Sequence, residues 1–72
     1  MNNFDLKWEV KKTVLHLDGQ FTLKDIILIL KEKNIMTKEN GDKVLNIISD
    51  ILELPLIQHI PFSDKYYVLG SK

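Results

Sequence analysis

Residues 56–70, LIQHIPFSDKYYVLG, contain two runs of apolar and β-branched residues separated by a polar turn at residues 63–65. The first run, residues 56–62, includes a proline, and the second, residues 66–69, ends at Gly70. Two short runs of strand-forming residues joined by about three turn residues are typical of a β-hairpin. The chain is therefore predicted to end in a hairpin, and the preceding elements determine what this hairpin packs against.

An amphipathic helix is predicted immediately before the hairpin, over residues 38–53, and Pro55 ends it. Its apolar residues recur at i, i+3, i+4 and i+7, the spacing of one helical face: Val44, Ile47, Ile48 and Ile51. Residues 40–42, Asn-Gly-Asp, are poor helix formers, so a start as late as residue 42 is the alternative.

Two further helices are predicted upstream. Residues 4–17 carry apolar side chains at i, i+4, i+8 and i+11, followed by Gly19 and a short extended link at residues 20–21. The next helix begins at Thr22, a good N-cap, with Asp25 completing a capping box, and Asn34 is its expected C-cap. The predicted inward-facing residues of the two helices are Leu6, Val10, Val14 and Leu17, then Leu23, Ile26, Ile27 and Leu30.

The order of these elements resembles that of the winged-helix superfamily. Residues 19–26, GQFTLKDI, look like the junction between the short strand and the second helix of such proteins, and residues 52–69 look like the passage into their wing. The resemblance covers nearly the whole chain and implies one α+β domain over residues 1–72, a three-helix bundle with a C-terminal β-hairpin wing. It also implies a helix-turn-helix whose third helix enters the major groove of DNA while the hairpin lies along the backbone.

Composition narrows the class of protein. Seventy-two residues allow one small domain, and 44% hydrophobic with 28% charged residues are ordinary globular values. The chain has no cysteine for disulfides or thiolate metal sites. Its N-terminus lacks a secretory signal pattern, and its longest apolar run, residues 26–30, is far below the ~20 residues of a membrane span. A cytoplasmic protein that does not bind membranes is therefore expected.

No catalytic machinery is predicted. The glycines are isolated from one another, no serine or cysteine nucleophile motif is present, and the carboxylates are scattered among lysines on helix surfaces. The two histidines, His16 and His59, belong to different elements and do not form a metal-ligand pattern. We therefore expect a protein that is not an enzyme and takes no metal, cofactor or small-molecule substrate.

Binding to double-stranded DNA is the first functional hypothesis. All ten basic residues are lysine, so the chain has no guanidinium fork for guanine or phosphate. The predicted outward face of the third helix is mostly acidic, with Glu39, Asp42, Asp50 and Glu53 beside Asn46 and Ser49. Residues 38–54 contain two lysines against four acids, a formal charge of −2, which repels phosphates. DNA contacts are expected only from the start of this helix and the wing: Lys38, Asn40, Lys43 and Lys65.

Binding to a protein is the alternative. The first helix has a second apolar stripe that points away from its core stripe, and one leucine of the second helix points opposite the buried face. Unless the tail or the hairpin covers Trp8, these residues form a homodimer interface or a partner surface: Phe4, Trp8, Leu15 and Leu28. The sequence thus predicts a non-enzymatic winged-helix protein that regulates transcription by binding DNA, or alternatively an interaction module without DNA binding.

Overall fold

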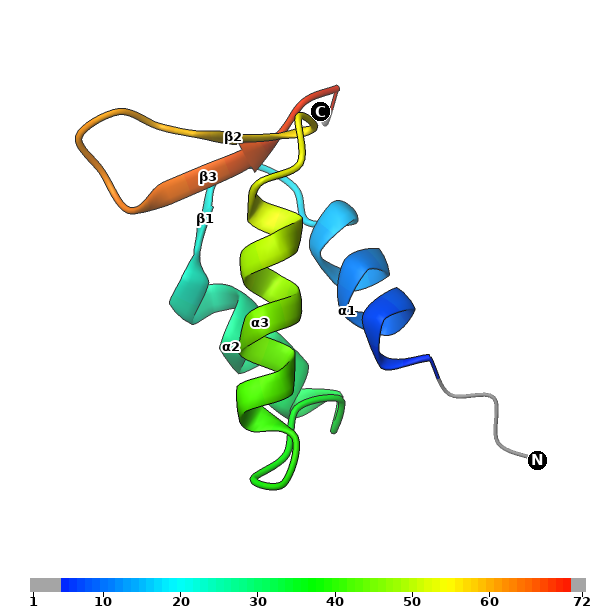
Figure 1. Ribbon diagram of the computed structural model, residues 1–72. Helices are drawn as coiled ribbons and strands as arrows, with labels where there is room; N and C mark the ends of the chain where they lie inside the picture. The colour runs from blue at the N-terminus through cyan, green and yellow to red at the C-terminus, as the bar shows by residue number, and fades with distance from the viewer. Residues whose placement is uncertain (1–4, 71–72) are drawn as a thin grey trace.

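The computed structural model describes residues 5–70. Their fold is α+β, and the predicted order of three helices followed by a C-terminal hairpin is confirmed (Figure 1). The elements are α1 (Leu6–Leu15), β1 (Phe21–Thr22), α2 (Leu23–Glu32), α3 (Gly41–Leu52), β2 (Ile57–His59) and β3 (Lys65–Val68).

The strands form one antiparallel sheet in the order β1-β3-β2. The hairpin strands β2 and β3 pair with Ile57 opposite Val68, and β1 adds to the other side of β3 with Phe21 opposite Tyr66. The link predicted at residues 20–21 is therefore a short strand one residue later, at Phe21–Thr22. Three helices with this three-stranded sheet are consistent with a winged helix.

Both ends of α2 are fixed by local hydrogen bonds. The capping box is confirmed, because Thr22 Oγ1 accepts the Asp25 N–H at 3.1 Å while the Thr22 N–H donates to Asp25 Oδ2 at 2.9 Å. At the other end Lys33 is the C-cap, and Asn34, the expected cap, lies one residue beyond it with a left-handed φ of 61°. There the Ile35 N–H donates to the carbonyl of Leu30 at 2.9 Å, the long bond of a Schellman motif.

The third helix begins at Gly41 rather than at residue 38, so the prediction of residues 38–53 was too long and the later start is closer. Residues 38–40 form a turn, because Asn40 uses its side chain to close the backbone before the helix instead of continuing it. Lys38 and Glu39 consequently lie before α3, and Glu53 is its C-cap.

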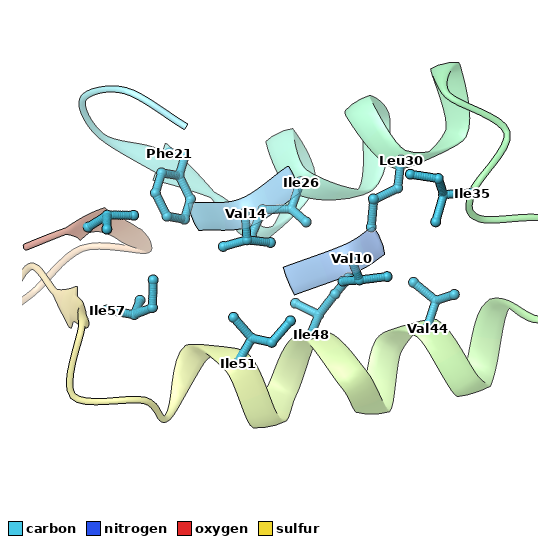
Figure 2. Packing of buried hydrophobic residues seen from close by; sticks show 11 residues of the cluster. Val10, Val14, Phe21, Ile26, Leu30, Ile35, Val44, Ile48, Ile51 and Ile57 are labelled. Carbon is cyan, nitrogen blue, oxygen red and sulfur yellow. The ribbon is translucent and has the colours of Figure 1, made fainter. Parts of the chain in front are cut away.

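The core lies between the three helices and the inner face of the sheet (Figure 2). Each helix contributes two fully buried branched side chains, and full burial of one such side chain stabilises the fold by about 1.5–3 kcal/mol. These six residues are Val10, Val14, Ile26, Leu30, Val44 and Ile48, and the loops, the sheet and the end of α3 add Phe21, Ile35, Ile51, Ile57 and Val68.

Two predictions about apolar residues were wrong. Leu23, assigned to the buried face of α2, is 40% exposed, because it is the first helical residue and lies at the edge of the core. Leu15, expected to point away from the core, is partly buried against it. Leu15 lies seven residues after Trp8, on the same side of α1, so helical spacing alone does not predict its partial burial at the last position of the helix.

Candidate functional site

The outward face of α3 is exposed and acidic. Asp42 and Asp50 lie on the helix, Glu39 just before it and Glu53 at its C-cap, and all four side chains are exposed. None of these carboxylates forms an ion pair with a lysine within residues 5–70. Their charges are therefore not neutralised by neighbouring side chains, and the same face also exposes the apolar side chain of Leu45.

The C-terminal end of α3 is its most negative part. Asp50 and Glu53 lie where the helix dipole is itself negative, and the last turn carries no basic residue. Asp50 shares a shallow hollow of about 160 Å³ with Lys7 and Lys11 of α1, but without an ion pair. A phosphate approaching this end of the helix meets two carboxylates and the negative end of the helix dipole, with lysines only on the side that faces α1.

The predicted DNA contacts lie at opposite ends of α3. Lys38 and Lys43 are exposed near its start, and Asn40, which lies between them in the sequence, is half-buried. Lys65 begins β3 and lies opposite Thr22, on the sheet at the other end of the helix (Figure 1). The 12 residues of α3 span about 18 Å. Lys38, Asn40 and Lys43 are therefore grouped at one end of the helix, and Lys65 is separated from them by its length.

A shallow hollow of about 350 Å³ lies beside the start of α3. Two lysines contribute to its lining, Lys38 and Lys31, the second of which comes from the last turn of α2. The first backbone N–H groups of a helix add positive potential, so this is the part of the α3 surface that repels phosphate least. Lys31 was not among the predicted contacts, although the short connection from α2 to α3 was a sequence signal that it lies nearby.

The predicted protein-interface residues do not form one patch. Trp8 is 55% exposed on α1 and Leu28 is 52% exposed on α2, whereas Leu15 packs partly against the core. Phe4 lies outside the described residues. Neither the hairpin nor any other segment of residues 5–70 covers Trp8, which within this part of the chain is the one residue of the predicted α1 stripe that is largely exposed.

Leu28 lines a groove of about 360 Å³ formed by the link from α1 to β1, by β1 itself and by the outer side of α2. Its apolar lining consists of Leu17, Phe21, Leu28 and Ile29, and its acidic lining consists of Asp18, Asp25 and Glu32. No lysine is among the described residues that line it. We call this surface the acidic groove.

The hairpin exposes apolar residues that sequence reasoning missed. Phe62, in the loop between β2 and β3, is fully exposed at 106% and has a left-handed φ of 65°. It was assigned to the first strand run, although the preceding proline was a signal that the strand ends earlier. Alternation along β3 also turns Tyr67 and then Leu69 away from the core, beside exposed Leu56.

The two histidines each donate a ring N–H to a backbone carbonyl, His16 to Lys12 and His59 to Ser63. Among residues 5–70, no three His, Cys, Asp or Glu side chains are grouped closely enough to hold a metal ion. The helices of this same segment are each too short or too polar to cross a membrane.

Comparisons of the chain with protein-family models, curated proteins and solved structures found no significant match. Function is therefore inferred from the geometry and charge of the surfaces described above.

Proposed function

We propose that this chain is a small winged-helix protein whose function is to bind another protein. The proposal depends on one observation: more than half of the Trp8 side chain is exposed, although the core is formed without it. An exposed indole is costly in water, and tryptophan is enriched among the residues that dominate protein interfaces. Leu28 and Phe62 add exposed apolar area on two other parts of the surface.

The charge pattern supports a protein partner over DNA. A recognition helix normally presents cations to phosphates, whereas α3 presents Asp42 and Asp50 with Glu53 at its end. Leu45, 39% exposed on the same helix, is also better suited to an apolar contact than to a groove lined by phosphates.

The test is affinity capture with the wild type and with Trp8→Ser, Leu28→Ser and Ser49→Ala variants. Ser49 is an exposed polar residue of α3 and serves as the matched control. A partner is expected to be recovered by the wild type and the control, to be lost with a tryptophan or leucine variant, and to bind again when both proteins are purified. Capture that is identical for all four proteins would contradict the proposal.

DNA binding through the start of α3 is the second candidate. It is favoured by the hollow that Lys31 and Lys38 share beside the helix N-terminus. A titration of mixed-sequence duplex at about 50 mM salt decides it, because electrostatic affinity is greatest at low salt. Binding that weakens steeply with salt, and that Lys38→Gln and Lys43→Gln reduce, would establish this candidate, whereas no binding at this salt concentration would eliminate it.

A further inference from the structure

The chain has a net charge of zero, but its charges are separated onto different surfaces. The acidic groove has three carboxylates and no lysine among the described residues that line it. One of these carboxylates, that of Asp25, also accepts the Thr22 N–H at 2.9 Å. The lining of the groove itself is therefore apolar and acidic, whereas Lys12 and Lys33 line the adjoining hollow, which shares Leu17 and Ile29 with it.

The exposed side of α1 has the opposite composition. Lys11 and Lys12 follow Trp8 at i+3 and i+4, the positions that lie beside it on a helix surface, and Lys7 is adjacent in the chain. Glu9, the one acid within α1, is paired with Lys12 at 3.5 Å. Three lysines against one glutamate give α1 a formal charge of +2, and the N-cap Asp5, whose carboxylate accepts the backbone N–H of Trp8, reduces this to +1 around the exposed indole.

We propose that Trp8 of one copy inserts beside Leu28 in the acidic groove of a second copy, so that the chain associates with itself. This inference rests on the proposed function and specifies the partner as a second copy of this chain. The apolar lining of the groove suits the indole, while the carboxylates around it suit the lysines beside Trp8. The groove, at about 360 Å³, is large enough to receive an aromatic side chain.

The contact is between two different surfaces, so the association is head to tail. Trp8 lies in the N-terminal half of α1, while the groove begins at Leu17, beyond the C-terminal end of that helix. A chain cannot fill its own groove with Trp8, because Val10 and Val14 hold α1 in the core. Head-to-tail contacts extend into chains unless the rotation between copies closes a ring. Assembly is thus expected to grow with protein concentration.

The experiment is sedimentation over a wide concentration range, combined with tryptophan fluorescence. The wild type is expected to associate as concentration rises, with blue-shifted emission as the indole leaves water, and to associate less at high salt. Trp8→Ala and Leu28→Ser are each expected to be monomeric. Leu56→Ser removes a leucine of similar exposure, 49% against 52% for Leu28, just before β2, and is the matched control, expected to associate like the wild type.

Mixing the two monomeric variants gives the sharpest test. Trp8→Ala retains an intact groove and Leu28→Ser retains an intact Trp8, so a 1:1 mixture is expected to form a heterodimer that cannot extend. Glu32→Lys provides a second way to disrupt the groove, at an exposed position outside the core, and is also expected to weaken association. Circular dichroism of each variant establishes that loss of association is not loss of folding.

A wild type that stays monomeric at all concentrations overturns the inference. It is equally overturned if the mixture of variants does not associate, or if Leu56→Ser has the same effect as Leu28→Ser. A monomeric wild type that still captures a different protein in a Trp8-dependent manner overturns self-association alone and leaves the proposed function intact. If the wild type neither self-associates nor captures a protein through Trp8, both the inference and the proposed function are rejected.

Discussion

Asn40 and Thr37 exchange two hydrogen bonds across the turn that leads into α3. Asn40 Oδ1 accepts the Thr37 N–H at 2.7 Å, and Thr37 Oγ1 accepts the Asn40 N–H at 3.3 Å. Asn40 Nδ2 also donates to the carbonyl of Ile35 at 2.9 Å. The side chain that the sequence suggested as a DNA contact thus holds the connection between α2 and α3.

Replacement of Asn40 by alanine is expected to lower the free energy of unfolding by about 1–2 kcal/mol, because two side-chain hydrogen bonds to the backbone are lost. Urea unfolding measures this change. Asn46→Ala, at an exposed site of α3, is the control and is expected to stay within about 0.5 kcal/mol of the wild type. An unchanged midpoint for Asn40→Ala would show that the turn does not need this side chain.

Asn34 is expected to tolerate glycine but not alanine. Its φ of 61° lies in the left-handed region, which glycine adopts freely and asparagine more readily than other residues. Asn34→Ala should therefore lower the free energy of unfolding by about 1 kcal/mol, whereas Asn34→Gly should be neutral or slightly stabilising. Thermal unfolding of the two variants side by side checks this, and equal stability of the pair would argue against a Schellman end for α2.

Phe62 is expected to be a site where stability and binding change in opposite directions. The residue has a left-handed φ of 65° and buries none of its side chain, so Phe62→Asn should relieve backbone strain without loss of packing. The midpoint of thermal unfolding, Tm, should rise by roughly 3–6 °C. If Phe62 also contacts the partner, capture by the variant should fall although the variant is more stable. A lower Tm would contradict the strain argument.

Neighbouring isoleucines of α3 test the orientation of the helix. Ile48 is fully buried and Ile47 only partly, so Ile48→Val should cost about 0.5–1.5 kcal/mol and Ile47→Val distinctly less. Chemical denaturation of both variants measures the difference. A larger cost at Ile47 would mean that α3 is rotated about its axis, which would turn different carboxylates outward.

Local patterns in the sequence predicted the helices well because their signals are short-range. The reciprocal bonds of Thr22 and Asp25 need only a spacing of three residues. Likewise Val44, Ile48 and Ile51 share a face through helical periodicity alone, and all three are buried. The acidic outward side of α3 followed from this same periodicity.

The surfaces could not be predicted in the same way because they combine distant segments. Lys65 was grouped with Lys38 by charge, but β3 places it at the opposite end of α3. The acidic groove joins residues from the link between α1 and β1, from β1 and from α2, and no single pattern along the chain contains them. The full exposure of Phe62 likewise depends on where the hairpin turns. The largely apolar run of residues 56–62 does not by itself show that the first strand ends before Phe62.

The pairing of β1 with β3 has a consequence for how the chain is made. Phe21 faces Tyr66 across the sheet, and their rings stack with centroids 6.4 Å apart, so the cover for Phe21 comes from β3, which follows all three helices in the sequence. During translation the helices can form while this cover is still absent, since they depend on contacts closer in sequence. A nascent or prematurely terminated chain that lacks β3 exposes the aromatic ring of Phe21 and an unpaired strand, both of which promote aggregation. The domain is therefore complete only once β3 has been synthesised and has paired with β1.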